Sequence, residues 1–271
     1  MWEDYELIDS GNLKKFERFG RYKFIRPEPQ AIWSPNINNW QADAYFLGKE
    51  EDGHWKFNAK ILSRWEMHYK DVKFWAEITP FRHLGVFPEQ FLQWEWMDSQ
   101  KPKNVLNLFG YTGLATLILA KNKASVTHVD ASKKAITWAR ENQKLSDLED
   151  KPIRWIIDDA IKFVEREVRR NRKYDGIILD PPKFGRGPNG ELWKIEESLP
   201  KLLQSCKNLL SDSPKFIALT TYALRLSSTS LGNLMQEIFN TTVESGELAV
   251  KEKNSGRILP SAIYSRIAFK S

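Results

Sequence analysis

The first candidate site is the glycine-containing turn at residues 107–113, which reads Asn-Leu-Phe-Gly-Tyr-Thr-Gly. It follows the apolar run 105–108 and precedes the helical stretch 114–120, so it joins a strand to a helix. Gly110 and Gly113 allow positive φ angles and a close approach between the backbone and a ligand. The spacing is neither the dinucleotide-binding G-x-G-x-x-G nor a P-loop. Alone, the motif fits either a plain turn or a ligand-binding turn.

Acidic residues end the next two expected strands. Asp130 follows the run 126–129, and its carboxylate could accept hydrogen bonds from both ribose hydroxyls of a nucleoside or cap the next helix. The pair Asp158-Asp159 follows the run 153–157 and could meet an adenine amino group or form a solvated turn. Together with the glycine turn, Asp130 predicts a nucleoside-binding site.

A rigid acidic motif, Asp180-Pro181-Pro182-Lys183-Phe184, follows the apolar run 176–179. Each proline fixes its own φ, so the strand ends in a stiff turn with hydrogen-bond acceptors at fixed places. The Phe184 ring offers a flat surface on which a planar substrate could stack. The alternative is a rigid turn that binds no ligand.

The elements that must position these motifs alternate between strand and helix from residue 103 onward. Strands are expected at 105–108, 126–129, 153–157, 176–179, 216–220 and 262–269. Helices are expected at 114–120, 132–145, 160–170, 199–210 and 231–239, with Ser132 as an N-cap. This alternation predicts an α/β fold, with a parallel sheet covered by helices and ligands at the carboxyl ends of its strands.

Residues 1–97 show a different sequence pattern. Short alternating or aromatic runs separated by turn formers occur at 22–25, 44–47, 55–57 and 72–78. Asp52-Gly53 between two of these runs predicts a β-hairpin. We therefore expect a small, mostly β domain at residues 1–97 and a second domain at residues 98–271.

The four motifs, in this order and spacing, resemble those of class I S-adenosylmethionine-dependent methyltransferases over about residues 70–225. The resemblance is closest to bacterial large-subunit ribosomal RNA methyltransferases that make 5-methylcytosine or 7-methylguanine. Upstream, residues 85–90 resemble the G-x-x-x-D-Q-R segment of that family, with Glu89 for its aspartate and Phe91 for its arginine. The resemblance implies a Rossmann-like, twisted seven-stranded methyltransferase sheet whose last strand is antiparallel.

The resemblance also implies roles for individual residues. Residues 109–113 would enclose the methionine part of S-adenosylmethionine, Asp130 would bind the ribose and Asp159 the adenine. The implied cofactor-binding residues are Gln90, Asn107, Phe109, Gly110, Thr112, Gly113, Asp130, Ala131, Asp158, Asp159 and Ala160. The implied catalytic residues are Asp180, Pro181 and Phe184. The product would be S-adenosylhomocysteine, and no metal is implied.

The cysteine content bears on which atom is methylated. Methylation at C5 of a pyrimidine needs a thiolate that adds to the ring, and Cys206 is the only cysteine. It shares a helical face with Leu199, Leu202 and Leu203, so we expect a packed, structural thiol. In the 5-methylcytosine relatives the nucleophile lies at the end of the next strand, where residues 219–222 here contain no cysteine. We therefore expect methylation of an RNA base nitrogen.

The charge distribution bears on the partner. Residues 1–100 carry a net charge of −3 and residues 101–271 a net charge of +9, which favours an acidic partner such as ribosomal RNA. The basic stretch 162–173 is either a solvated helix face or a phosphate-contacting patch. An alternative function is protein methylation, because D-P-P-aromatic motifs also serve amide nitrogens and the first domain is acidic.

Composition excludes several other classes. With 41% hydrophobic and 28% charged residues, the chain is neither disordered nor fibrous. No apolar run approaches the ~20 residues of a membrane span. The first ten residues contain no Lys or Arg, unlike a signal peptide. One cysteine and four histidines argue against a zinc site. We expect a cytoplasmic protein.

Overall fold

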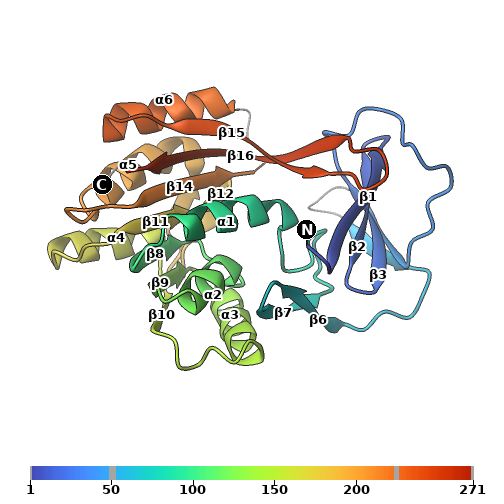
Figure 1. Cartoon of the computed structure of the whole chain (residues 1–271), viewed down its shortest axis with the longest axis horizontal. Coiled ribbons are helices and arrows are strands. Elements are labelled where there is room, and N and C mark those ends of the chain that lie inside the picture. Colours follow the sequence, from blue (N-terminus) through green and yellow to red (C-terminus); the bar gives the residue numbers. More distant parts are fainter. Residues whose placement is uncertain (1, 49–52, 223–225, 270–271) are drawn as a thin grey trace. The chain divides into compact units, whose positions relative to one another are not determined.

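The computed structural model of the chain describes residues 2–48, 53–222 and 226–269 (Figure 1). These residues fall into two units, Met1–Glu89 with Ala249–Ser261, and Gln90–Leu248 with Ala262–Ser271. The expected domain boundary at residue 97 stays a prediction. In the structure, the chain enters the second unit before helix α1 (Phe91–Ser99), and the segment 249–261 returns to the first.

The second unit is built on a seven-stranded sheet with the strand order β10-β9-β8-β11-β14-β16-β15. The strands are β8 (Asn104–Leu108), β9 (Ser125–Asp130), β10 (Ile153–Ile157), β11 (Gly176–Leu179), β14 (Phe216–Thr221), β15 (Glu244–Lys251) and β16 (Ile258–Ala268). The first five in this spatial order are parallel, and β16 is antiparallel to β14. The predicted seven-stranded α/β sheet is therefore confirmed, although strand β15 was not expected.

Helices connect these strands. They are α2 (Leu114–Lys121), α3 (Lys133–Leu145), α4 (Ala160–Arg169), α5 (Ile195–Lys207) and α6 (Ser228–Phe239), after the short 3₁₀ helix η1 (Pro88–Gln90) and α1. The expected N-cap of α3 is confirmed, because Ser132 accepts a hydrogen bond from the Ala135 backbone N–H at 3.2 Å. Helix α5 begins at Ile195, four residues before the expected start at 199, even though it contains Pro200.

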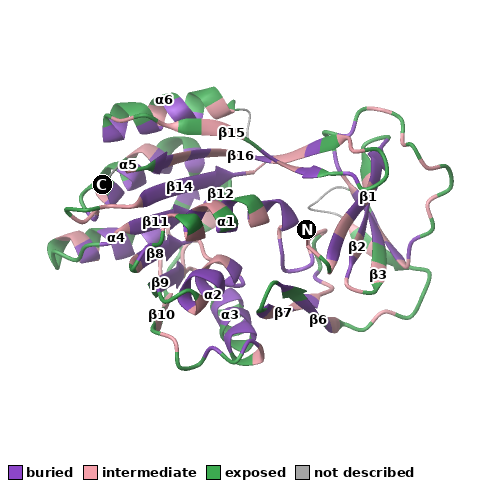
Figure 2. Cartoon of the chain, viewed as in Figure 1, coloured by how far each residue is buried: buried purple, intermediate pink, exposed green. Residues whose placement is uncertain are grey.

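The core of this unit lies around the central strands. Every residue of β11 and β14 is buried, whereas the edge strand β10 has none buried (Figure 2). Strands covered on both faces read as continuous apolar runs, which explains why β11 and β14 were easy to locate in the sequence.

The first unit contains a five-stranded sheet in the order β1-β2-β3-β4-β5 and a separate strand pair, β6 with β7. The strands are β1 (Tyr5–Gly11), β2 (Lys14–Phe19), β3 (Tyr22–Pro27), β4 (Ala44–Leu47), β5 (His54–Phe57), β6 (Arg64–Tyr69) and β7 (Val72–Glu77). Strand β3 pairs with β4 in parallel, and the other neighbours are antiparallel. The expected hairpin is confirmed as β4 with β5; Asp52 of its turn lies outside the described residues.

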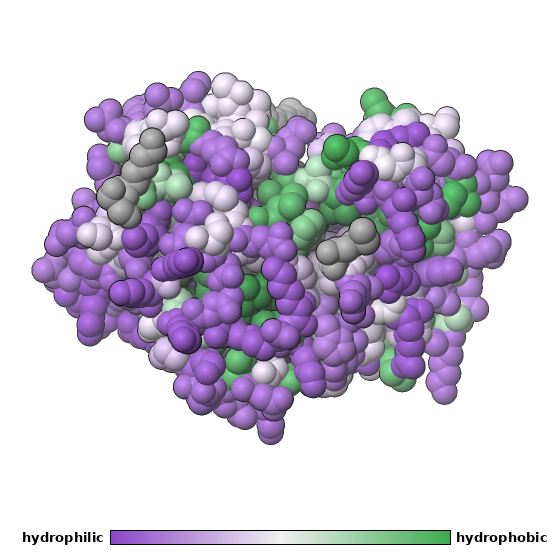
Figure 3. Space-filling model, viewed as in Figure 1, coloured by the Kyte–Doolittle hydropathy of each residue, from purple (hydrophilic) through white to green (hydrophobic). Residues whose placement is uncertain are grey.

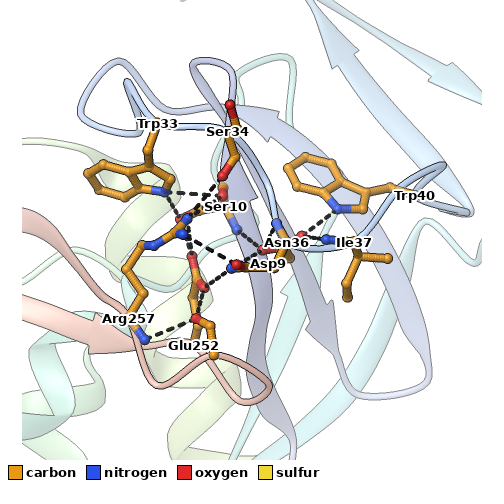
Figure 4. A network of polar contacts seen from close by, with 10 residues as sticks. Asp9, Ser10, Trp33, Ser34, Asn36, Ile37, Trp40, Glu252 and Arg257 are labelled. Atoms are coloured by element: carbon orange, nitrogen blue, oxygen red, sulfur yellow. Dashed lines mark hydrogen bonds and ion pairs between the residues drawn. The ribbon is translucent and has the colours of Figure 1, made fainter.

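A partly buried polar network joins the two segments of the first unit (Figure 4). Glu252, from segment 249–261, accepts hydrogen bonds from the Ser10 hydroxyl and, at 3.2 Å, from the Asn36 side-chain amide. The Arg257 guanidinium lies 5.4 Å from the centre of the Trp33 ring. The side chains of these five residues turn toward one another, so residues from both segments share one cluster of polar contacts.

Hydrophilic side chains cover most of the molecular face in Figure 3, and hydrophobic ones gather in a few patches. Among the described residues, no helix is both long and apolar enough to cross a membrane.

Candidate active site

Candidate site residues lie at the carboxyl ends of four strands of the sheet. Of the predicted residues, Asp130 is the last residue of β9, Asp158 follows β10 and Asp180 follows β11; Tyr222, which was not predicted, follows β14. From β8 the chain continues to β9 on one side and later to β11 on the other, so the strand order switches here. Ligands of open α/β sheets bind at such a switch point.

The turn after β8 has an unusual backbone. Phe109, Tyr111 and Gly113 all have positive φ angles, of 58°, 50° and 86°. Gly110 is needed for a different reason than the sequence suggested. A Cβ atom at Gly110 would lie 2.3 Å from Cε1 of His128, so the glycine accommodates a buried imidazole ring of the same unit. The turn is thus held in shape by its own packing, in a conformation that costs free energy at two non-glycine residues.

A chain of buried polar side chains lies beneath this turn. The Asn107 amide donates to the Thr116 hydroxyl at 2.9 Å, and that hydroxyl lies 2.9 Å from Nδ1 of His128. Burial lowers the pKa of His128 to about 3, so the imidazole is neutral at physiological pH. Because the Asn107 amide nitrogen bonds to α2, a contact between Asn107 and the cofactor stays a prediction. Thr112 is buried, and its carbonyl accepts from the Asn142 amide at 2.9 Å.

Asp130 has the properties of a ligand-binding carboxylate. Its two oxygens accept one backbone hydrogen bond each, from Tyr111 at 2.9 Å and from Ser132 at 2.8 Å. Burial raises its pKa, and these two hydrogen bonds only partly oppose that effect. A carboxylate can accept about four hydrogen bonds, so Asp130 retains capacity for ribose hydroxyls, and the residues present fit the implied cofactor.

The pair Asp158-Asp159 has partners within the chain. Asp159 is the N-cap of α4, where it accepts from the Lys162 backbone N–H at 3.0 Å. Asp158 forms an ion pair with Arg166 and accepts from the Asp159 backbone N–H at 2.9 Å. The expected contacts of these residues, and of Ala131 and Ala160 beside them, with the cofactor stay predictions.

Asp180 is held by a residue from outside the sheet. The Gln90 side-chain amide nitrogen, at the end of η1, donates to Asp180 Oδ2 at 3.0 Å and to the Tyr222 hydroxyl at 3.0 Å. A carboxylate only accepts hydrogen bonds, so the amide must present its N–H₂ group here. Gln90 was predicted to bind the cofactor, and that role stays a prediction; within the chain its contacts orient the acidic group that follows β11.

The residues after Asp180 form a β-hairpin. Strands β12 (Phe184–Arg186) and β13 (Leu192–Lys194) pair antiparallel. Trp193 of β13 is buried, its indole N–H donates to the Pro182 carbonyl at 2.6 Å, and its ring lies 4.9 Å from that of Phe109. Pro181 is buried, whereas Phe184 is 57% exposed. The hairpin therefore leaves Phe184 accessible, four residues after Asp180.

The expected burial of Cys206 is confirmed. The thiol lies in the core cluster of α5 with Leu199, Leu202 and Leu203, and none of its surface is exposed. Burial raises its pKa far above the ordinary value, so the thiolate is not available at neutral pH.

Three of the six basic residues in the stretch 162–173, which covers most of α4, pair with neighbouring carboxylates. Lys162 pairs with Glu191 at 2.5 Å, and Arg170 pairs with Glu167 at 3.3 Å. Together with the Asp158–Arg166 pair, these contacts favour a solvated helix face over a phosphate-contacting patch. No group of three or more His, Cys, Asp or Glu suited to hold a metal ion occurs within the described part of the chain.

Sequence reasoning missed Tyr222 and His128 as residues of this region. Tyr222 had a detectable signal, because it directly follows a buried strand adjacent to β11. His128 had none, since a polar residue within strand β9 gives no indication of the glycine turn packed against it.

Comparisons with known proteins agree with this geometry. Residues 49–218 match the family model described as S-adenosylmethionine-dependent methyltransferase. The crystal structure of a SAM-dependent methyltransferase from Agrobacterium tumefaciens is 45% identical, with a TM-score of 0.96 over 100% of this chain and 92% of that one. The methyltransferase SMU.776, solved with SAH, is 14% identical with a TM-score of 0.76 over 97% of this chain and 75% of that one, which supports the fold alone.

Curated relatives match a shorter stretch. The ribosomal RNA large subunit methyltransferase K/L of Pseudoalteromonas atlantica is 32% identical over 148 residues, which are 54% of this chain and 20% of that protein. The same-named protein of Shewanella frigidimarina is 32% identical over 149 residues, 54% of this chain and 21% of that protein. The chain thus spans about a fifth of the length of the curated relatives it matches.

Proposed function

We propose that this chain, which belongs to the S-adenosylmethionine-dependent methyltransferase family, methylates a base nitrogen of ribosomal RNA without a cysteine nucleophile. The observation that carries the proposal is the end of β11. There Asp180 is held by Gln90, the exposed ring of Phe184 follows four residues later, and the chain's one thiol is buried elsewhere in the core.

The cofactor of the family is S-adenosylmethionine, and its reactive group is a methyl on a positively charged sulfur. We assign its binding to the strand ends on the β8–β10 side. The turn 109–113 would enclose the methionine part, and the free accepting capacity of Asp130 would take the ribose hydroxyls. Asp159, at the end of the neighbouring strand β10, would lie toward the adenine.

The acceptor side is assigned to the residues that follow β11. Asp180 and the Pro181 carbonyl would accept hydrogen bonds from a target N–H, which places the nitrogen and its lone pair for attack. The exposed Phe184 ring would stack on the target base, which must leave its own stack to reach this place. As the nitrogen gains a methyl group, Asp180 is the nearby carboxylate that can take up its proton.

The position of Cys206 supports nitrogen over carbon as the methylated atom. Attack on C5 of a pyrimidine would need an accessible thiolate. Cys206 is fully buried in α5, and β14 ends in Thr221 and Tyr222 rather than in a cysteine. A ring or exocyclic nitrogen needs only alignment and a hydrogen-bond acceptor, which Asp180 supplies.

The choice of RNA rests on the names of the curated relatives and on charge. Both relatives are called ribosomal RNA large subunit methyltransferases, and residues 101–271 carry a net charge of +9. The alternative acceptor is a protein amide or side-chain nitrogen, which the same D-P-P-aromatic motif could accommodate.

A labelling experiment tests the proposal. Purified enzyme is incubated with methyl-tritiated S-adenosylmethionine and with RNA and protein fractions from a strain lacking the gene. We expect label in RNA, and digestion to nucleosides followed by chromatography should give an N-methylated base. Label in protein alone would support the alternative acceptor, and a C-methylated pyrimidine would contradict the assigned chemistry.

A further inference from the structure

The hairpin of β12 and β13 has two faces of different character. In its register, Phe184 lies opposite Lys194 and Arg186 opposite Leu192, with Gly185 and Trp193 between them. Directly opposite residues of an antiparallel pair share a face, and residues two apart along a strand do too. Phe184, Arg186, Leu192 and Lys194 therefore form one face, which we call the outer face of the hairpin.

The other face is fixed to the candidate active site. Trp193 is 4% exposed, donates to the Pro182 carbonyl and packs against Phe109 of the turn after β8. The Ile195 backbone N–H donates to the Lys183 carbonyl at 3.1 Å, which closes the base of the hairpin. The hairpin is therefore anchored at the end of β11, and its outer face begins four residues after Asp180.

The outer face combines apolar and cationic groups. Phe184 is 57% and Leu192 is 51% exposed, so two large apolar side chains are accessible on this one face. Arg186 is also exposed. Lys194 pairs with Glu197 at 2.9 Å, but both side chains are exposed, so that pair is weak.

The charge of the hairpin is positive. Residues 183–194 contain Lys183, Arg186 and Lys194 against the single acid Glu191. Glu191 forms an ion pair with Lys162 of α4 and not with a basic residue of the hairpin. A flat aromatic ring and an aliphatic side chain between cations match a nucleic acid strand, in which bases stack and phosphates carry the negative charge.

We propose that the outer face of the β12–β13 hairpin is a binding surface for the single-stranded RNA that flanks the target base. This inference rests on the proposed RNA substrate. Phe184 meets the target base, Leu192 packs on an adjacent base or ribose, and Arg186 contacts a phosphate. The surface contributes substrate affinity, and the chemistry remains with Asp180.

The test compares Arg186→Ala and Leu192→Ala with the control Arg140→Ala, which removes an exposed arginine from α3. The probe is a labelled single-stranded RNA of about 12 nucleotides, within the usual site size of single-strand binders. Its affinity is measured by fluorescence anisotropy over a range of salt concentrations. Cofactor affinity by calorimetry and the single-turnover rate at saturating RNA are measured on the same proteins.

The two variants should weaken RNA binding in different ways. Arg186→Ala should lower affinity several-fold and reduce the slope of log affinity against log salt by about 0.7, the value for one phosphate contact on a single strand. Leu192→Ala should lower affinity about 3- to 10-fold with an unchanged slope, as expected for lost stacking. Both should keep cofactor affinity and the saturated rate, and Arg140→Ala should behave as the wild type.

Two outcomes would overturn the inference, and they differ. If the wild type methylates RNA but Arg186→Ala, Leu192→Ala and the charge reversal Arg186→Glu all bind the probe normally, the hairpin is not the binding surface and the proposed function stands. If the wild type neither binds nor labels RNA and labels only protein, the proposed function fails and the inference fails with it.

Discussion

Two buried or half-buried aspartates, one in each unit, are satisfied to very different extents. Asp9, in the network of Figure 4, accepts from the backbone N–H groups of Ser10, Asn36 and Ile37, the Asn36 amide and the Trp40 indole. Asp130, at the end of β9, accepts from two backbone N–H groups and from no other group of the described residues. The first carboxylate is saturated by its own chain, and the second is not.

The pKa shifts of the two carboxyl groups follow this difference. Burial raises the pKa of Asp9, but the Ile37, Trp40 and Asn36 hydrogen bonds outweigh that effect and the net shift is downward. For Asp130 the burial effect prevails and the pKa is raised. A carboxylate whose hydrogen-bonding positions are all filled by the chain stabilises the fold. One at a strand end that accepts few hydrogen bonds can still accept others from a ligand.

The largest effect is expected at the acceptor side of the active site. Asp180→Ala should reduce single-turnover methyl transfer by roughly 10²-fold or more, the scale of losing one transition-state hydrogen-bonding group. Cofactor affinity by calorimetry should stay close to that of the wild type. A wild-type rate in this variant would remove Asp180 from the chemistry and leave only the cofactor-binding assignment.

Variants of Gln90 test the same assignment from the side of its partner, because the Gln90 amide contacts both Asp180 and Tyr222. Gln90→Ala should lower the rate less than Asp180→Ala does, and Gln90→Glu should lower it more than Gln90→Ala, because two carboxylates would face each other. Loss of cofactor affinity with an unchanged rate at saturating cofactor would instead support Gln90 as a cofactor-binding residue.

In the first unit, the expected effect is on stability. Asp9→Ala leaves one buried and several partly buried donors without this acceptor and should lower the free energy of unfolding by about 2–3 kcal/mol. Methyl transfer per folded molecule should not change. Urea denaturation and a rate normalised to folded protein measure both quantities, and a loss of rate without a loss of stability would contradict the contrast with Asp180.

Asp130→Ala should weaken the binding of S-adenosylhomocysteine by about 30-fold, because the ribose hydroxyls lose a hydrogen bond to a charged acceptor, which contributes about 2 kcal/mol. The increase in melting temperature on adding this product should shrink accordingly. Asp150→Ala, a fully exposed aspartate, is the control and should bind normally. Equal affinity in Asp130→Ala would place the ribose elsewhere.

The sequence predicted the sheet well where physical patterns were strong. Strands β8, β11 and β14 are apolar runs because helices cover both faces, and the Asp-Pro-Pro turn after β11 is rigid by covalent structure. Strand β15 was missed because its residues, Glu244–Lys251, alternate weakly and include Gly246. The return of residues 249–261 to the first unit depends on contacts such as Glu252 with Ser10, which no local pattern encodes.

The site was predicted in part for the same reason. Asp130 and Asp180 were found because they end strands. The contact of Gln90 with Asp180 joins residues ninety positions apart, and the contact of Gly110 with His128 depends on side-chain packing. Sequence spacing locates such residues on an edge of the sheet, but only tertiary structure decides which of them touch.

His128 predicts a pH dependence of stability that arises beneath the active-site turn. Its folded pKa is about 3, and that of an unfolded histidine is about 6.5. Between these values the unfolded state binds more protons, so stability is fully present above pH 6.5 and is lost as the pH falls toward 3. The loss from this group is about 1.4 kcal/mol per pH unit. Urea denaturation at pH 7 and pH 5 should show a smaller loss in His128→Gln; an identical loss would exclude His128 as the source.

The smallest effect is expected at Cys206, which tests whether the second unit also contains a purely structural residue. The thiol is fully buried in the core cluster and its pKa is raised by burial, so it can be neither a nucleophile nor a ligand-binding group. Cys206→Ala removes one buried sulfur atom and should cost about 1 kcal/mol of stability, near the low end for core truncations. Methyl transfer should continue at the wild-type rate, whereas Cys206→Ser should be less stable than Cys206→Ala because its hydroxyl is buried. An inactive but folded Cys206→Ala, or a covalent complex of the wild type with RNA containing 5-fluorocytosine, would instead make the thiol catalytic and the methylated atom a carbon.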